Sequence, residues 1–136
     1  MPAEAALVTY LDALVSETAG TDLFEGPMPE SPDNCVAVAH YDSQSPEGRV
    51  MAGSLVDNAG LWPVSVQVMA RNVSKTAAEA RCRAYLDLLD NLGPVTLSGV
   101  LYHSCEADGE PMNLGQDQGG SRWRFAFNLT CRKARG

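Results

Sequence analysis

The chain has 136 residues, of which 45% are hydrophobic and 20% are charged. This length and composition are typical of one globular domain that can bury its own core without disulfides or metal ions. The net charge of −7 argues against a general nucleic-acid-binding protein, because phosphate contacts need a basic surface.

The charge is divided unevenly along the chain. Five of the ten basic residues gather near the C-terminus, at Arg122, Arg124, Arg132, Lys133 and Arg135. The first 121 residues therefore hold 5 basic and 17 acidic residues, which gives them a net charge of −12. A chain polarised in this way could pair with copies of itself or with an oppositely charged partner. The alternative is a solvated surface with a basic tail.

The four cysteines, at positions 35, 82, 105 and 131, are widely spaced among apolar neighbours. The sequence contains no C-x-x-C motif and no secretory leader. We therefore expect reduced, buried thiols in a cytosolic setting. No run of about 18 apolar residues is present, so a membrane-spanning helix is not expected.

The first third of the chain predicts a helix, a long loop and a strand. Residues 3–17 have helical periodicity, with an apolar stripe of Leu7, Tyr10, Leu11, Leu14 and Val15. Gly20 is suitably placed to end this helix. Residues 20–34 contain three prolines and two glycines and predict a long loop, either a surface loop pinned by two apolar residues or a contact surface or mobile segment. Residues 35–40 (CVAVAH) are apolar and partly β-branched, which favours a strand.

Residues 41–62 are ambiguous, because residues 50–55 could finish a strand or form a hairpin arm and residues 57–60 are a turn signal leading into the next strand. If residues 35–40 and 63–71 pair antiparallel, this segment becomes a long hairpin tip. A tip of that length cannot pack on the core throughout and would project from the domain.

The middle of the chain predicts a strand followed by a helix. Apolar and polar residues alternate over residues 63–71, as in a half-buried strand. Ser74 is a suitable N-cap, and Gly93 and Pro94 are suited to end the helix. The predicted apolar stripe of this helix comprises Ala78, Cys82, Tyr85, Leu89 and Leu92.

The last third of the chain predicts three strands. Ser98 and Gly99 form a two-residue turn between short apolar runs at 95–97 and 100–105. Residues 106–120 are acidic and glycine-rich and predict a second long loop. In the final strand, Trp123, Phe125, Phe127, Leu129 and Cys131 alternate with polar or basic residues.

The predicted order is therefore α-β-β-α-β-β-β, within one domain spanning residues 1–136. We expect an α+β fold, with a single mixed, mainly antiparallel sheet and two helices packed on one face. Long loops are expected at about 20–34, 41–62 and 106–120. The polar face of the last strand should contact water or a neighbouring subunit.

The candidate sites for chemistry are weak. His40, His103 and Cys105 lack the repeated close ligand pairs of a zinc site. The acidic loop 106–120 lacks the spacing of a calcium-binding loop, and no glycine loop leads into a helix as a phosphate site requires. No G-x-S-x-G motif is present. We therefore expect no catalytic residues, no metal site and no cofactor, and the features favour assembly.

Two stretches together resemble a known family. The first is the strand at 63–68 with Arg71 and an alanine-rich helix that ends before Gly93. The second contains Leu114, Gly115, Asp117, Gly119, Gly120, Arg122, Phe125 and Asn128. Over about residues 5–132 this pattern resembles the minor capsid, or tail terminator, proteins of long-tailed bacteriophages.

The resemblance implies a structural virion protein without cofactor or reaction. Such proteins form a hexameric ring that caps the last layer of the tail tube and presents a docking face for the head connector. The implied partners are copies of the same chain, the tail tube protein and a head–tail connector or neck protein. The implied location is the tail–neck region of the virion, after assembly in the host cytoplasm.

Several residues are candidates for contacts with subunits or partners. Arg122 and Arg124 could form salt bridges between subunits, and Asp117 could fix its own turn or contact a partner. Asn128, Arg71 and Arg49 complete this set of candidates. The loop tips at 41–60 and 108–120 are expected to contact the tube or the neck.

Other functions stay open at this point. One alternative within the same class is a neck or head-completion protein of the head–tail interface. A different class is a small ligand-binding domain or enzyme with a pocket between sheet and helices. A nucleic-acid module is disfavoured, because Trp123, Phe125 and Phe127 alternate away from the neighbouring arginines.

Overall fold

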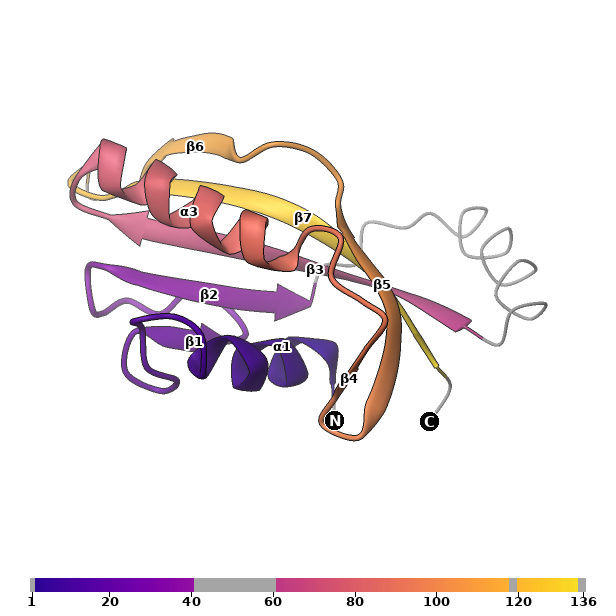
Figure 1. The fold of residues 1–136 in the computed structure, drawn as a ribbon. Helices are drawn as coiled ribbons and strands as arrows, with labels where there is room; N and C mark the ends of the chain where they lie inside the picture. Colours follow the sequence, from indigo (N-terminus) through magenta and orange to yellow (C-terminus); the bar gives the residue numbers. More distant parts are fainter. Residues whose placement is uncertain (1, 41–60, 118–119, 135–136) are drawn as a thin grey trace.

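A computed structural model describes residues 2–40, 61–117 and 120–134 of the chain (Figure 1). These residues form two helices and seven strands, which confirms the expected α+β class. The helices are α1 (Ala3–Asp12) and α3 (Lys75–Leu89). The strands are β1 (Leu23–Glu25), β2 (Cys35–His40), β3 (Leu61–Asn72), β4 (Val95–Leu97), β5 (Val100–Ala107), β6 (Met112–Gln116) and β7 (Trp123–Ala134).

All seven strands belong to one mixed sheet. Their order is β1-β2-β3-β7-β5-β4, and β6 pairs with β7 beyond the end of β5. Among the described strands, β1 and β2 pair in parallel, and all other neighbouring strands pair antiparallel. β2 and β3 pair antiparallel, which the sequence analysis considered as a condition, and Cys35 lies opposite Arg71. β5 and β6 follow one another along the same side of the long strand β7.

The structure contains two strands that the predicted order lacks. β1 lies within the predicted loop 20–34, because buried Leu23 anchors it and backbone bonds join it to β2. β6 lies within the predicted loop 106–120, because the side of β7 beyond β5 offers unpaired backbone groups. Neither segment has strong strand propensity, so pairing with the sheet decides its conformation.

One hydrophobic cluster joins both helices to the sheet. Val36 and Val38 of β2 lie in register with Ala70 and Val68 of β3, and these lie opposite aromatic residues of β7. Leu7 and Leu11 of α1 and four residues of α3 belong to the same cluster. The buried residues of α3 are Ala78, Cys82, Tyr85 and Leu89, as the stripe predicted. The alternating residues of β7 are also buried as expected, except that Trp123 is only partly buried.

The helix boundaries differ from the predicted ones. α1 ends at Asp12 and not near position 17, because Asp12 Oδ1 accepts a hydrogen bond from Ala19 N at 2.9 Å and the chain turns back. Leu14, predicted to be buried, is therefore 52% exposed. Ser74 caps α3 as predicted, since its Oγ accepts from Ala77 N at 3.3 Å.

The end of α3 was also predicted too late in the chain. The helix ends at Leu89, so Gly93 does not close it. Instead Gly93 has a φ of 120°, and a Cβ at this position would lie 2.8 Å from the His103 carbonyl oxygen. The glycine therefore permits close contact between the segment after α3 and β5. The hairpin after it is as predicted, because Ser98 and Gly99 both have positive φ values.

The expected projecting tip at 41–62 cannot be compared with the structure over most of its length. Residues 41–60 lie outside the described ranges. Leu61 and Trp62 belong to β3, so this strand begins two residues earlier than predicted.

Candidate interaction surface

The long ladder formed by β3 and β7 defines two distant ends of the molecule (Figure 1). The two strands pair over twelve residues, from Leu61 opposite Ala134 to Asn72 opposite Trp123. At about 3.3 Å per residue, the two ends of the ladder lie roughly 35 Å apart. Mostly exposed carboxylates lie at one end, and the cationic residues Arg132 and Lys133 lie at the other.

The first end lies beside the loop 27–34, and its most buried charged residue is Arg71. The Arg71 side chain is only 5% exposed and points toward this loop. Its guanidinium donates to the carbonyl oxygens of Asp33 at 3.1 Å, Glu30 at 3.3 Å and Pro32 at 2.5 Å. These bonds satisfy backbone carbonyls of an irregular segment that lacks sheet partners. Arg71 therefore fixes the loop on the sheet.

Arg122 holds the same loop from the start of β7. Its Nε donates to Asp117 Oδ2, and its Nη1 donates to the Glu30 carbonyl oxygen at 2.6 Å. Nη1 also lies 3.4 Å from Asp33 Oδ1, and Nη2 lies 3.7 Å from Glu30 Oε1. The Glu30 and Asp33 carboxylates are nevertheless mostly exposed, with side-chain exposures of 97% and 66%. Both remain accessible to a partner.

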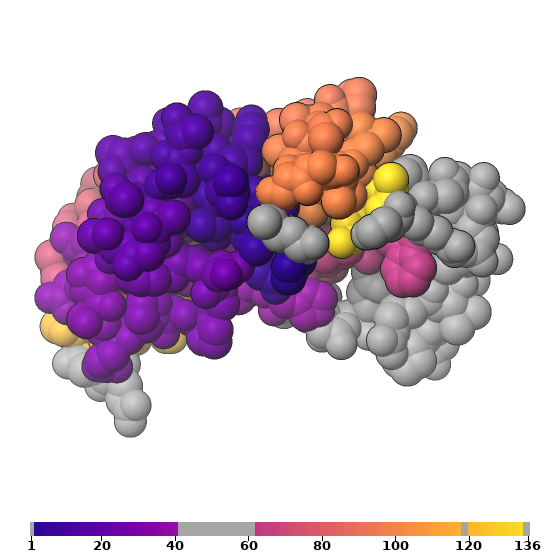
Figure 2. All heavy atoms as spheres, turned by 90° about the horizontal axis from the view of Figure 1, so that it is seen from below, coloured from indigo at the N-terminus to yellow at the C-terminus, as the bar shows by residue number. Residues whose placement is uncertain are grey.

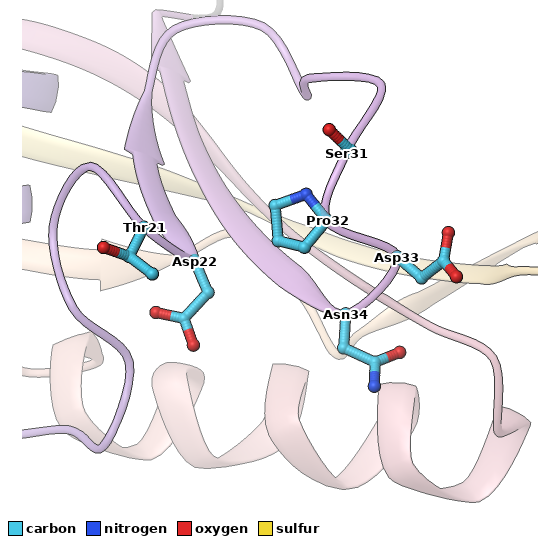
Figure 3. A pocket seen from close by; sticks show the side chains of 6 residues that line it. All are labelled: Thr21, Asp22, Ser31, Pro32, Asp33 and Asn34. Carbon is cyan, nitrogen blue, oxygen red and sulfur yellow. The ribbon is translucent and has the colours of Figure 1, made fainter.

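A hollow of about 580 Å³ opens beside this loop (Figure 3). Six residues from two separate segments line it, namely Thr21, Asp22, Ser31, Pro32, Asp33 and Asn34. All of these side chains except Pro32 carry a hydroxyl, amide or carboxylate group, and Asp22 and Asp33 give the lining a negative charge. We call Asp22, Glu30 and Asp33 the acidic end of the ladder.

The opposite end of the ladder is basic. Arg132 is exposed and Lys133 is half-buried, and they lie opposite Pro63 and Trp62 in the β3–β7 register. Within the described ranges, no carboxylate lies within 4 Å of either cationic group. Trp62 is 50% exposed, and the exposed Leu101 lies on the adjacent strand β5. We call Trp62, Leu101, Arg132 and Lys133 the basic end of the ladder.

The surface near the basic end also brings together segments far apart in the sequence. Seen from below, the N-terminal segment, drawn in indigo, lies beside the orange β4–β5 hairpin (Figure 2). Apolar groups are exposed near the acidic end as well, at Val73, Met112 and Leu114. Each end thus combines charge with exposed apolar side chains, which is the composition of many protein–protein contact patches.

The structure gives the predicted contact residues specific positions. Asn128 Oδ1 accepts from Gln67 Nε2 at 3.2 Å, so Asn128 links β7 to β3 across the polar face of the sheet. Arg124 donates from Nη2 to the Leu114 carbonyl oxygen at 3.4 Å, while its buried Nε has no hydrogen-bond partner within the described ranges. Arg71 and Arg122 meet at the loop 27–34, and Arg124 lies next to Arg71 in register.

Asp117 and Arg49 are the two remaining residues that were predicted to make contacts. The backbone of Asp117 closes the turn before β7, because Asp117 N donates to the Arg122 carbonyl oxygen at 2.8 Å and Gly120 N to the Asp117 carbonyl oxygen at 2.8 Å. The carboxylate of Asp117 accepts from Arg122 rather than only capping its turn. Arg49 lies outside the described residues. Contacts of these residues with a partner stay predictions.

Sequence reasoning named the loop 20–34 as a possible contact surface, but it did not identify Glu30 and Asp33 within it. A signal was present in the charge distribution. Residues 1–40 contain seven acidic residues and no lysine or arginine. Such a segment needs cations from elsewhere in the chain or from a partner. Arg71 and Arg122 provide part of that charge, over sequence distances that local patterns do not reveal.

The described residues offer neither a metal site nor a membrane-spanning helix. Among the residues that the structure describes, no group of three or more His, Cys, Asp or Glu side chains could hold a metal ion. No helix in the same residues is long and apolar enough to cross a membrane. All four cysteines are free and buried, as predicted. Burial raises the pKa of the Cys82 thiol to about 12, so this group stays protonated at neutral pH.

The fold and this surface define a small α+β domain that exposes the Glu30 and Asp33 carboxylates at one end of the ladder and the cations of Arg132 and Lys133 at the other. Comparison with protein families identifies which subunit it is. Residues 10–135 match the family described as bacteriophage tail terminator protein, so the chain belongs to that family. The match confirms the resemblance seen in the sequence and makes the chain a structural tail protein of the virion. No individual curated protein gives a significant match.

Proposed function

We propose that copies of this chain form a closed ring that ends the phage tail tube and joins it to the head. The family match over residues 10–135 carries this proposal. The ring has six copies, as the family resemblance implies. It caps the last layer of the tube, prevents further polymerisation and presents its other side to the head connector. It assembles in the host cytoplasm and stays in the tail–neck region.

A ring requires a heterologous interface, in which two different patches of each subunit meet. The acidic end and the basic end of the ladder are two such patches, and they lie at opposite ends of the subunit. We propose that the acidic end of one subunit contacts the basic end of the next. Exposed Trp62 would bury its ring at this contact, where aromatic and arginine side chains commonly dominate binding energy.

The net charge of the chain also favours this arrangement. Six copies carry six times −7, or −42 charges, so a ring must offset considerable repulsion. Placing Arg132 and Lys133 against Glu30 and Asp33 at every interface supplies local attraction. Arg122 and Arg124 support this interface by fixing and flanking the acidic end, which refines their proposed role as direct salt-bridge partners.

Residues 41–60 and 108–120 are proposed to contact the tube or the neck protein. The second segment contains β6, which pairs with β7. Deleting all of 108–120 would remove a strand and could unfold the sheet, so it is not a clean test. Replacing Met112 and Leu114 by serine tests the same surface, because both side chains are exposed. Weaker tube or neck binding by a normally folded variant would support the assignment, and unchanged binding would remove it.

The function is tested by mass and by tube length. The purified chain is measured by mass photometry, alone and with the tail tube protein, and tubes are then grown with and without it. The proposal predicts a single closed oligomer and tubes that stop growing once capped. A stable monomer that leaves tube length unchanged would overturn it. Binding to the connector without binding to the tube would instead identify a neck or head-completion protein.

A further inference from the structure

Two of the four cysteines face each other across neighbouring strands. Cys105 of β5 lies directly opposite Cys131 of β7 in the antiparallel register. Both side chains are fully buried, and both thiols are free. The other two cysteines are in different places, because Cys35 contacts Met28 Sδ at 3.2 Å and Cys82 lies on α3.

The backbone bonds identify the kind of pair that Cys105 and Cys131 form. Cys105 N donates to the Leu92 carbonyl oxygen at 2.7 Å, so its backbone points away from β7. Asp108 N donates to the Asn128 carbonyl oxygen at 2.8 Å, which places the bonds to β7 on the alternate residues. Cys105 and Cys131 are therefore a non-hydrogen-bonded pair, in which Cα atoms lie about 4.5 Å apart. Disulfides span Cα separations of about 4.4–6.8 Å, so this pair can be bridged without moving the strands far.

The two thiol groups affect each other's titration. Interaction with Cys131 lowers the pKa of the Cys105 thiol, while burial opposes this change. Interaction with Cys105, together with burial, raises the pKa of Cys131. These directions favour Cys105 as the thiol that becomes a thiolate, which is the nucleophilic form of cysteine. By contrast, burial raises the pKa of Cys35 and of Cys82.

We propose that Cys105 and Cys131 form a cross-strand disulfide once the virion has left the reducing cytoplasm of the host. Virion surfaces are among the oxidising environments in which disulfides persist. The oxidant is a hydroperoxide, which is small enough to reach the pair when the sheet opens locally. The pair stays reduced during assembly, when cytosolic thiols keep cysteines in that state.

The reaction proceeds in two balanced steps. The Cys105 thiolate attacks one oxygen of hydrogen peroxide, the O–O bond breaks, and hydroxide leaves to become water, which produces a sulfenic acid on Cys105. Cys131, after losing its proton, attacks that sulfur and displaces hydroxide, which takes up the proton and leaves as a second water. Overall, two thiols and one peroxide give one disulfide and two waters, with two electrons passing from sulfur to oxygen.

The bond would strengthen the part of the chain that supports the acidic end. The segment between the two cysteines, residues 106–130, carries β6, Asp117 and Arg122. Closing this segment reduces the freedom of the unfolded chain more than that of the folded chain. We therefore expect a more stable subunit after oxidation, with the same fold and the same charged ends.

The direct test uses the full-length protein and hydrogen peroxide. After treatment, the protein is denatured, its remaining thiols are alkylated, and peptides are identified by mass spectrometry. The proposal predicts two alkylated thiols, at Cys35 and Cys82, and one linked peptide pair joining Cys105 to Cys131, reversed by dithiothreitol. Alkylation of all four thiols, or a bond involving Cys35 or Cys82, would overturn it.

A matched pair of variants tests the effect on stability. In the Cys35→Ser/Cys82→Ser variant, peroxide should raise the thermal midpoint by about 10 °C, because the bridge closes a segment of moderate length. In a Cys131→Ser variant, peroxide should give no such rise. If Cys131→Ser fails to fold, Cys105→Ser serves in its place. Equal responses of the control and the single variant would contradict the proposal. This test does not depend on ring formation, so it can fail while the proposed function stands.

Discussion

The two ends of the β3–β7 ladder differ in how their charges are neutralised. At the acidic end, Arg71 and Arg122 hold the loop 27–34 through its carbonyl oxygens and carboxylates. At the basic end, Arg132 and Lys133 have no carboxylate within 4 Å in the ranges that the structure describes. The loop at one end is thus held by arginines of its own chain, whereas the cations at the other end have no carboxylate partner among the described residues. A single pair of strands thus carries, at one end, arginines that hold a loop of the same chain and, at the other, cations that could contact a partner.

The largest effect is expected from Arg71→Ala. The change removes three hydrogen bonds and leaves the carbonyl oxygens of Pro32 and Asp33 without the Arg71 donor, while the Glu30 carbonyl oxygen keeps its bond from Arg122. We expect a loss of about 3 kcal/mol in the free energy of unfolding, because buried polar groups lose a charged partner. Urea denaturation measures it. The control is Arg83→Ala, whose ion pair with Glu110 is long and exposed, and it should cost less than about 0.5 kcal/mol.

A smaller loss of stability is expected from Arg122→Ala. The variant loses the bonds to Asp117 and to the Glu30 carbonyl oxygen, whereas the loop 27–34 keeps its bonds from Arg71 and the bond from Val73 N to Asn34 Oδ1. Its thermal midpoint should fall less than that of Arg71→Ala and more than that of Arg132→Ala, which should hardly change. Equal effects of Arg122→Ala and Arg132→Ala on thermal unfolding would refute the proposed difference between the ends.

High salt should weaken the oligomer without unfolding the subunit. Raising the ionic strength from about 0.1 M to about 1 M shortens the Debye length from about 10 Å to about 3 Å, which screens exposed charges. We expect the dissociation constant of the oligomer to rise by about tenfold or more, because exposed charges at both ends form the proposed contact. Mass photometry across salt concentrations measures this change. An oligomer that is insensitive to salt would show that apolar contacts, and not the charged ends, hold it together.

The smallest effect on stability is expected at alkaline pH and concerns Tyr102, which lies in the hydrophobic core. Burial raises the pKa of Tyr102 to about 12, above its ordinary value of 10.0. The unfolded chain therefore loses this proton first, and stability is fully present below about pH 10 and declines as the pH rises toward 12. Tyr102→Phe should reduce this decline. At neutral pH the same variant should lose little or no stability, because the buried hydroxyl has no hydrogen-bond partner within the described ranges.

Local patterns predicted the parts of the fold that local physics determines. The bounds of β2, the Ser74 cap of α3 and the Ser98–Gly99 turn were predicted correctly from residue type and periodicity. Periodicity also predicted the buried face of α3, because a single stripe must cover the sheet. Family membership could be recognised because it rests on such local stretches.

Long-range pairing explains what the sequence did not reveal. β6 has the composition of a loop and becomes a strand only because β7 extends beyond β5. The role of Arg71 depends on a proline-rich loop that folds back over a distance of about forty residues. The pairing of Cys105 with Cys131 depends on an irregularity between Tyr102 and Ser104, and a shift of one residue would separate the two thiols.

The contact between acidic and basic ends is tested most directly by exchanging their charges. One variant carries Glu30→Lys and Asp33→Lys, and a second carries Arg132→Glu and Lys133→Glu, with thermal melting used to verify that both are folded. The account predicts that neither variant forms the wild-type oligomer alone, whereas an equimolar mixture restores a ring of alternating subunits with the wild-type mass. If each variant assembles alone like the wild type, or if the folded pair fails to assemble when mixed, the proposed interface is wrong.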